Sequence, residues 1–326
     1  MTGRTVIFQN PASGTSNLET RSRVRDLLAG HGDTVKEVMV NPGIRLVEQA
    51  LQFVKDGAKL VVAAGGDGTV REIASALVGT EATLGIVPLG TFNNLARSLN
   101  LPSDTDAACD LIQRRLTRKI DVGLADDRHY FFEVAGVGVD ADLFPIGEEV
   151  KSGRFENILH AIYLASRHAQ SSANLCFDRP VEEAYKHSFR GQFPLKRRRR
   201  RFKKKRRGIT IRCSFIAVGN GPFYGSNFAV CPGAVLDDGL FSISVFRDFS
   251  KFELIRHFWS ISRGHRQYHP KLETFEGREF EISSCKPLSV HADGHSIGTT
   301  PMRFRVLPGA LKVVADRSLR AASWSA

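Results

Sequence analysis

The 326-residue sequence lacks long apolar runs. No stretch reaches about eighteen uninterrupted apolar residues, which is near the lower limit for a membrane-spanning helix. We also expect no secretory leader, because residues 1–4 (MTGR) are short and polar and lead directly into an apolar segment. We therefore expect a cytoplasmic protein that meets a membrane only as a peripheral protein at its inner face.

Cysteine is scarce and scattered. The five cysteines form no Cys-x-x-Cys pair, and no Cys/His spacing is typical of zinc. This excludes a disulfide framework and indicates reduced, mostly buried thiols of a cytoplasmic protein. They are Cys109, Cys176, Cys213, Cys231 and Cys285.

Net positive charge is nearly absent outside one segment. The net charge is +12, and residues 196–207 (KRRRRRFKKKRR) contain 11 basic residues, so the rest of the chain carries +1 (12 − 11). Nucleic-acid-binding surfaces usually spread their charge more widely, which argues against that partner. Because like charges repel, we expect a disordered loop that docks on anionic lipid. Nucleic-acid binding, nuclear targeting and a solvated loop without a partner are the alternatives.

The first third of the chain alternates strand and helix patterns. The segment 59–64 (KLVVAA) has no polar alternation, as in a parallel strand that is buried on both faces. The pattern predicts an α/β domain with a mostly parallel sheet. The predicted strands are 5–9, 34–40, 59–64 and 84–87, and the predicted helices are 18–29, 44–55, 72–78, 93–99 and 105–116.

From residue 118 the pattern changes to short strands separated by Gly, Pro and Asp. It predicts an antiparallel, β-rich second domain. The expected domains are 1–122 and 123–316, the second with the basic insertion 196–207, and then a flexible tail at 317–326. The predicted strands are 120–124, 130–136, 209–218, 240–246, 279–283, 288–292 and 303–307, and helices are expected at 154–170 and 252–262.

A glycine-rich run, Gly65-Gly66-Asp67-Gly68-Thr69, follows the apolar strand and precedes a helix. Glycine lets backbone N–H groups approach phosphate oxygens, and the helix N-terminus adds its dipole. A carboxylate beside phosphate needs a cation or a hydroxyl partner, so we expect Asp67 to act with Mg²⁺. The spacing fits neither a Walker nor a dinucleotide-binding motif. These five residues alone are equally compatible with a tight, capped turn.

Two other polar turns follow predicted strands. They are Asn10-Pro11-Ala12-Ser13-Gly14 and Pro88-Leu89-Gly90-Thr91-Phe92-Asn93-Asn94. Ligands of open α/β sheets bind outside the carboxyl ends of the strands. The three turns at 10–14, 65–69 and 88–94, here called the cradle, are therefore predicted to form one phosphate- and nucleotide-binding site.

Together these motifs resemble the soluble bacterial diacylglycerol kinase-like lipid kinases, which are related to eukaryotic diacylglycerol, sphingosine and ceramide kinases. The resemblance covers nearly the whole chain, including 218–221, 224–225, 232–240 and 292–294. It implies an NAD kinase-like α/β nucleotide-binding domain, a β-sandwich domain, and transfer of the γ-phosphoryl group of ATP to diacylglycerol or a related lipid alcohol at the membrane surface. The predicted ATP contacts are Asn10, Gly65, Gly66, Asp67, Gly68, Thr69, Val70, Arg71, Thr91 and Asn94, the last standing where many relatives have aspartate.

The resemblance also implies a structural Mg²⁺ site in the sequence VLDDGL at 235–240. Its ligands would be the carboxylate of Asp238 and the backbone carbonyls of Val235 and Leu240. Oxygen ligands of this kind suit a hard cation. Without the resemblance, Asp-Asp-Gly would indicate a hairpin turn.

The turn Ala292-Asp293-Gly294-His295 is the predicted catalytic turn. A lipid hydroxyl must lose a proton as it attacks phosphorus, so a base is needed nearby. The family pattern is Asp-Gly-Glu, and the glutamate is the usual proton acceptor, whereas this chain has His295. Asp293 and His295 are joint candidates, with Asp293 first, and Asp67 completes the predicted catalytic set. A plain hairpin turn is the alternative.

Two other functions remain compatible with the sequence. NAD kinases share the Gly-Gly-Asp-Gly-Thr turn, and a regulatory ATP- or lipid-binding protein without turnover would tolerate the change at His295. The Pro-Leu-Gly-Thr-x-Asn-Asn and Asp-Asp-Gly-Leu motifs favour the lipid kinases over the NAD kinases. Neither the identity of the lipid nor the oligomeric state follows from the sequence.

Overall fold

The computed structural model describes residues 4–29, 34–41, 43–138, 171–190, 193–194, 206–224, 228–231, 233–247 and 272–316. The chain forms two compact units. Unit 1 contains residues 1–122, 236–239 and 307–326, and unit 2 contains 123–235 and 240–306. Residues 236–239 thus belong to unit 1, although they lie within the segment 123–316 that we expected to form one continuous domain.

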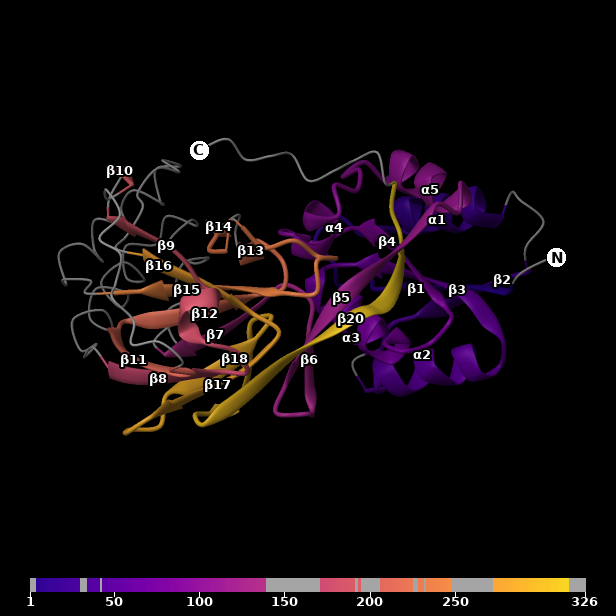
Figure 1. The fold of residues 1–326 in the computed structure, drawn as a ribbon. Helices are drawn as coiled ribbons and strands as arrows, with labels where there is room; N and C mark the ends of the chain where they lie inside the picture. Colours follow the sequence, from indigo (N-terminus) through magenta and orange to yellow (C-terminus); the bar gives the residue numbers. More distant parts are fainter. Residues whose placement is uncertain are drawn as a thin grey trace, which may run out of the picture. The chain divides into compact units, whose positions relative to one another are not determined.

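Unit 1 is an α/β unit with a parallel sheet in the order β4-β3-β1-β2. Helices α1 and α5 lie on one face of the sheet, and α2 and α3 lie on the other (Figure 1). Strands β3 and β4 are buried almost throughout, as their mainly apolar sequences require, and the exception is Lys59 near the start of β3. Its elements are β1 (Arg4–Gln9), α1 (Leu18–Ala29), β2 (Thr34–Met39), α2 (Leu46–Lys55), β3 (Ala58–Gly65), α3 (Asp67–Leu77), β4 (Thr83–Pro88), α4 (Asn94–Ser98) and α5 (Thr105–Gln113).

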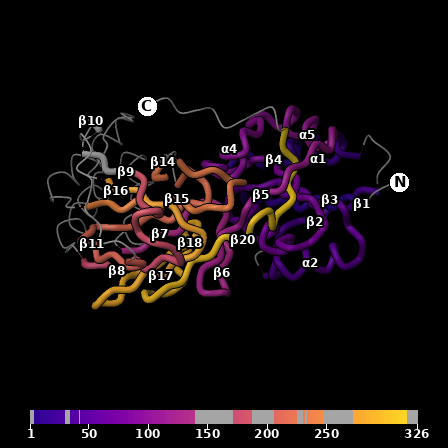
Figure 2. The backbone as a smooth tube through the Cα atoms, viewed as in Figure 1, coloured from indigo at the N-terminus to yellow at the C-terminus, as the bar shows by residue number. Residues whose placement is uncertain are grey.

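Two long strands carry the chain between the units. They are β5 (Thr117–Ala125) and β20 (Met302–Val314). The last part of β20 pairs in parallel with β4, with Lys312 opposite Thr83. Its first part pairs antiparallel with β17 (Glu279–Ser284) of unit 2. Figure 2 shows this strand in yellow.

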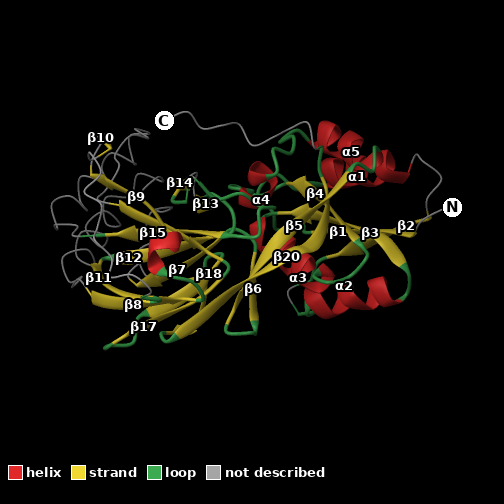
Figure 3. Cartoon of the chain, in the orientation of Figure 1, coloured by secondary structure: helices red, strands yellow, loops and turns green. Residues whose placement is uncertain are grey.

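Unit 2 consists almost entirely of strands among its described residues (Figure 3). One antiparallel sheet has the order β10-β9-β16-β15-β12-β7-β18-β19, and a second antiparallel layer contains β11, β8 and β17. Both layers contribute side chains to one core, in which Phe131 stacks on Phe241 and Phe280 stacks on Phe304. The predicted β-sandwich is confirmed.

The remaining elements of unit 2 are β6 (His129–Phe131), β7 (Val134–Gly138), β8 (Ser171–Phe177), α8 (Val181–Ala184), β9 (Tyr185–Arg190), β10 (Phe193–Pro194), β11 (Gly208–Cys213), β12 (Phe215–Gly219), β13 (Phe223–Tyr224), β14 (Phe228–Ala229), β15 (Phe241–Phe246), β16 (Leu272–Gly277), β18 (Ser289–Ala292) and β19 (His295–Thr299). The expected helices 154–170 and 252–262 and the tail 317–326 lie outside the described residues.

The single strand predicted at 209–218 is wrong. The segment forms two strands, β11 and β12, which lie in different sheets. The break is at Ser214, whose backbone N–H donates to the carbonyl of Phe246 at 2.8 Å. The apolar pattern continues through the break because both halves face the same core, so periodicity alone does not reveal it.

The thiols agree with the expectation from composition. All five cysteines are free, and Cys109, Cys213 and Cys231 are buried. Burial raises the pKa of Cys109 and of Cys231 to about 12, so both stay protonated at neutral pH. In the part of the chain that the structure describes, no helix is long and apolar enough to cross a membrane.

A buried aspartate on β5 holds unit 1 together. The side chain of Asp121 accepts the N–H of Gly239 at 2.6 Å and that of Gly309 at 2.7 Å. Its own backbone N–H donates to the carbonyl of Leu236 at 2.7 Å. One residue therefore fixes the returning segment 236–239 and the last part of β20 within this unit.

Replacement of Asp121 by alanine is expected to destabilise the protein by about 2–4 kcal/mol, since two N–H groups lose a charged acceptor. Urea unfolding followed by circular dichroism would measure this. Asp110→Ala, at an exposed position on α5, is the matched control and should change stability by less than about 0.5 kcal/mol. Equal midpoints for the two variants would contradict the role of Asp121.

Candidate active site

The three turns of the cradle lie together at the carboxyl edge of the unit 1 sheet. The N–H of Asn10 donates to the carbonyl of Ala64 at 3.0 Å, and that of Leu89 to the carbonyl of Gly65 at 3.0 Å. The N–H of Thr15 donates to the carbonyl of Leu89 at 3.1 Å. Parallel strands end at the same edge, so turns that are far apart in sequence become neighbours.

Two of these turns touch through glycine. A Cβ atom added to Gly90 would lie 2.5 Å from the Cα atom of Gly66, closer than such atoms can approach. A Cβ atom on Gly65 would lie 2.8 Å from the Cβ atom of Thr69. Glycine is therefore required by the contact between the turns, in addition to any requirement from a ligand.

Helix α3 begins at Asp67, five residues before the predicted start at 72. Gly66 is its N-cap, so Gly68, Thr69 and Arg71 lie within its first turns. The sequence reads as a loop because of its glycines, but the backbone is helical from Asp67 onward. The N–H groups in the first turn of a helix have no intrahelical acceptor, which makes this end of α3 suited to bind an anion.

Asp67 joins two of the turns. Its carboxylate accepts the N–H of Asn93 at 2.9 Å and that of Asn94, the first residue of α4, at 2.7 Å. Burial raises the pKa of Asp67, and the hydrogen bonds from Asn94 and Asn93 oppose that rise. The carboxylate thus holds the turn at 90–94 against the start of α3. Its expected action with Mg²⁺ stays a prediction.

Other side chains of the cradle bind one another. The amide of Asn10 donates to the hydroxyl of Thr69 at 2.8 Å, and the hydroxyl of Ser13 accepts the N–H of Gly66 at 3.1 Å. Asn93, in the left-handed conformation with φ 52°, exchanges two hydrogen bonds with the backbone of Gly90. Ser13 was not among the predicted contacts, although its position in the first turn could have indicated it.

Two polar atoms, one in the cradle and one in the adjoining helix α3, have unused hydrogen-bonding capacity. The Oδ1 atom of Asn94 and the Nε atom of Arg71 are buried and have no hydrogen-bond partner within the described ranges. Buried polar atoms in native proteins usually have partners. An acceptor and a charged donor left in this state beside a helix N-terminus fit a polar, anionic ligand.

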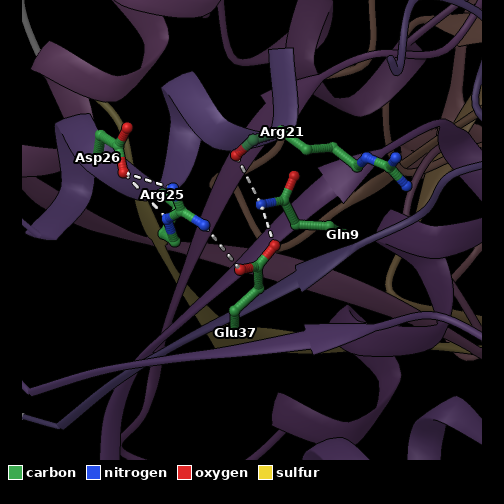
Figure 4. Close-up of polar contacts among 5 residues, drawn as sticks. All are labelled: Gln9, Arg21, Arg25, Asp26 and Glu37. Carbon is green, nitrogen blue, oxygen red and sulfur yellow. Dashed lines mark hydrogen bonds and ion pairs between the residues drawn. The ribbon is translucent and has the colours of Figure 1, made fainter. Parts of the chain in front are cut away.

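Sequence reasoning missed Gln9, the last residue of β1, which anchors the edge below the cradle (Figure 4). Its fully buried side chain donates from Nε2 to the carbonyl of Arg21 and to Oε1 of Glu37, both at 2.9 Å. Arg25 lies 4.0 Å from the other oxygen of Glu37. The N–H of Val40 donates to the carbonyl of Gln9 at 2.8 Å, which brings the loop after β2 to the same edge.

In unit 2, the predicted catalytic turn is a tight hairpin between β18 and β19. Asp293 and Gly294 have φ of 45° and 81°, as the two central residues of such hairpins require. One carboxylate oxygen of Asp293 accepts the N–H of Phe132 at 2.7 Å, and the other accepts those of Glu133 at 3.1 Å and Val134 at 3.0 Å. Both oxygens are thus engaged with backbone.

His295 differs from Asp293 in its surroundings. It is the first residue of β19, it is exposed, and it lies opposite Ala292 across the hairpin. An imidazole at this position is accessible to a substrate hydroxyl, whereas the carboxylate of Asp293 holds three N–H groups. The structure thus leaves His295 exposed and engages both carboxylate oxygens of Asp293 with backbone. Which of the two accepts the proton stays a prediction.

The predicted Mg²⁺ ligands lie in an exposed loop. Asp238 and Val235 are exposed, and Asp237 forms an ion pair with Arg118 at 2.8 Å. Within the described ranges, no group of three or more His, Cys, Asp or Glu side chains could hold a metal. A set made of one carboxylate and two carbonyls, as expected from Asp238, Val235 and Leu240, would not form such a group, so this set stays a prediction.

Two protein-family models match the chain. Residues 4–125 match the diacylglycerol kinase catalytic domain. Residues 199–315 match the YegS C-terminal NAD kinase beta sandwich-like domain. The two matches follow the order of the α/β and β-sandwich parts described above.

Relatives with curated names extend the similarity over most of the chain. A Pectobacterium atrosepticum protein named "Probable lipid kinase YegS-like" is 30% identical, over 82% of this chain and 80% of that protein. A Mycobacterium tuberculosis protein named "Diacylglycerol kinase" is 26% identical, over 89% and 93% of the two chains.

Solved structures share the fold. A diacylglycerol kinase structure from Bacillus anthracis superposes with a TM-score of 0.71 at 19% identity and covers 97% of this chain and 98% of its own. Yeast NADH kinase superposes with a TM-score of 0.50 at 11% identity and covers 99% of this chain and 86% of its own. The α/β unit followed by a β-sandwich is therefore an architecture that kinases of both kinds use.

Proposed function

Because the chain belongs to the family of diacylglycerol kinases and YegS-like lipid kinases, we propose that it transfers the γ-phosphoryl group of ATP to the hydroxyl group of diacylglycerol or a related lipid alcohol. The observation that supports this most directly is the cradle, in which three turns meet at the N-terminus of α3. Phosphoryl transfer depends mainly on positioning and on charge stabilisation, and this arrangement can supply both.

ATP binding would use the groups of the cradle that still have hydrogen-bonding capacity. Phosphate oxygens would accept from the first-turn N–H groups of α3, where the helix dipole favours negative charge. Arg71 would add a charged donor, and the amide oxygen of Asn94 would accept from the nucleotide. Asp67 would keep the two turns in register, and Thr91, which is exposed, would contact the ligand from the third turn.

Proton transfer would use the hairpin of unit 2. The attacking lipid hydroxyl loses its proton to a base, and His295 is the exposed group that can accept it. Asp293 would hold the hairpin against the backbone of residues 132–134.

Mg²⁺ is the expected metal cofactor. The carboxylate of Asp238 and the carbonyls of Val235 and Leu240 are hard oxygen donors of the kind that Mg²⁺ prefers. Mg²⁺ bound by this set would be structural, whereas Mg²⁺ acting with Asp67 would supply positive charge that offsets charge on the phosphates.

A kinase assay with labelled ATP, Mg²⁺ and mixed micelles of candidate lipids tests the proposed reaction. Label is expected in diacylglycerol or in another lipid alcohol of the panel. NAD is the comparison acceptor, because NAD kinases share the glycine-rich turn and the fold. Transfer to NAD alone would exclude a lipid kinase, and the absence of transfer to any acceptor would favour a regulatory binding protein.

We also propose that the basic segment 196–207 binds the anionic surface on which a lipid substrate lies. Residues 196–205 lie outside the described residues, but Arg206 and Arg207 are described and exposed. The carbonyl of Arg206 accepts the N–H of Val181 at 2.9 Å, and that of Arg207 accepts the N–H of Phe177 at 2.8 Å. The segment is thus attached to unit 2 through its last two residues.

Replacement of the nine basic residues at 196–205 by serine is expected to weaken binding to anionic vesicles at least about a hundredfold at low salt, since each contributes about 1 kcal/mol near such a surface. Arg206 and Arg207 are kept so that their backbone contacts remain. Co-sedimentation with phosphatidylglycerol-containing vesicles measures the effect, and neutral phosphatidylcholine vesicles are the control. Unchanged sedimentation with the anionic vesicles would refute membrane docking through this segment.

A further inference from the structure

A buried histidine lies directly before the predicted catalytic turn at 292–295. His291 on β18 is 1% exposed, and its neighbours Val290 and Ala292 face the core between the sheets. Side chains alternate along a strand, so His291 points to the opposite face. There it meets Tyr224 of β13, which is 4% exposed and belongs to a second apolar cluster.

The two side chains are in direct contact. The hydroxyl of Tyr224 lies 2.9 Å from Nδ1 and 3.0 Å from Nε2 of His291, and the ring centroids are 5.0 Å apart. Val134, Ala217 and other apolar side chains complete the cluster around Tyr224. A hydrogen bond in such surroundings is stronger than in water, and its loss costs more.

The contact between Tyr224 and His291 is the first of three links. A second link connects the loop 220–224, which contains Tyr224, to Glu133. The backbone carbonyl of Glu133 accepts the N–H of Asn220 at 2.8 Å and that of Gly221 at 2.9 Å, and its carboxylate accepts that of Phe223 at 3.4 Å. A Cβ atom on Gly221 would collide with the carboxylate of Glu133. The loop 220–224 therefore lies directly against residue 133.

The third link is Asp293, whose carboxylate holds the N–H groups of residues 132–134. The three links form a closed path. Asp293 contacts residues 132–134, Glu133 contacts residues 220–223, and Tyr224 contacts His291. A single residue, Ala292, then joins His291 to Asp293 along the chain. We call this set the buried ring. All of it lies in unit 2.

We propose that Tyr224 and His291 are positioning residues for phosphoryl transfer, because they hold the strand that leads into the hairpin and so fix the location of His295. The inference rests on the proposed function. Strand β18 pairs with β7 on one side and with β19 on the other, which leaves its two faces to be held by side chains. The contact of His291 with Tyr224 supports one of these faces directly before the hairpin. A displacement of about 1 Å at a reacting group can lower a rate about a hundredfold, so support of this kind affects catalysis.

Steady-state kinetics of matched variants tests the inference. Tyr224→Phe and His291→Leu each remove the hydrogen bond and are expected to lower kcat about tenfold, with the KM for ATP unchanged because the cradle contains no residue of the ring. His291→Gln keeps a hydrogen-bonding side chain and should retain most of the activity. The double variant Tyr224→Phe/His291→Leu should be no slower than the slower single variant. Tyr185→Phe is the control for the loss of a hydroxyl, because Tyr185 packs next to Phe275 in the core between the two sheets of unit 2.

Hydrogen exchange provides a readout that does not require activity. The amides of residues 132–134 are expected to exchange about tenfold faster in Tyr224→Phe than in the wild type. The variant lacks the hydrogen bond between Tyr224 and His291, which is one of the three links of the buried ring. Unchanged exchange, or an unchanged kcat in both Tyr224→Phe and His291→Leu, would overturn the inference. A wild-type protein that phosphorylates no lipid would instead overturn the proposed function and the catalytic part of the inference with it.

Discussion

Replacement of Asp67 by alanine is expected to reduce lipid phosphorylation at least about a hundredfold while leaving the protein folded. The carboxylate of Asp67 accepts the N–H groups of Asn93 and Asn94, so its removal releases the turn at 90–94 from the start of α3. Arg71 and Asn94, whose buried atoms are expected to bind ATP, would then no longer be held relative to each other. Both the KM for ATP and kcat should change.

The measurement is the steady-state kinase assay, together with circular dichroism to verify folding. Asp104→Ala is a close control, because Asp104 caps helix α5 by accepting the N–H of Ala107 at 3.0 Å. It should lose about 1 kcal/mol of stability without loss of activity. Asp67→Asn should fall between wild type and Asp67→Ala, since one amide oxygen can replace only part of the carboxylate. Near-normal activity of Asp67→Ala would refute the role of this turn.

Replacement of His295 by alanine is expected to lower kcat by about a hundredfold to ten-thousandfold, the usual contribution of a general base. The hairpin should stay intact because its shape depends on Asp293 and Gly294 rather than on the imidazole. The KM for ATP should change little, since His295 is not among the predicted ATP contacts. Full activity of His295→Ala would place the base elsewhere.

His295→Glu provides the complementary test, because it introduces the residue that the family pattern has at this place. Activity should be retained, with a shift in its dependence on pH. A base must be deprotonated to act, so the rate falls as pH drops through its pKa, and ordinary values are about 6.5 for imidazole and about 4.3 for a glutamate carboxyl. The acid limb of the kcat profile should therefore move to lower pH. An unmoved limb would show that residue 295 is not the base.

The sequence predicted the cradle because the rule that locates it depends on local features. Each turn follows an apolar strand, and parallel strands of one sheet end at the same edge. The bonds from Asn10 to Ala64 and from Leu89 to Gly65 have the neighbours that this rule predicts. The start of α3 at Asp67 was missed because Gly66 and Gly68 resemble a loop in composition.

Other parts of the site depend on contacts between distant residues, which no local pattern encodes. Gln9 reads as an ordinary strand residue, and its importance comes from the approach of Arg21 and Glu37. Asp121 likewise gains its role from Gly239 and Gly309, more than a hundred residues later.

The sequence by itself determined the two-part architecture, the three turns of the cradle and the position of the turn at 292–295, because periodicity, glycine and turn chemistry act over a few residues. Only the tertiary structure decided what those residues do to one another. It engages the carboxylates of Asp67 and Asp293 with backbone N–H groups, leaves His295 exposed, and buries His291 against Tyr224. These outcomes depend on which segments become neighbours when the sheets form, and a buried donor or acceptor takes its partner from whatever neighbour the fold provides.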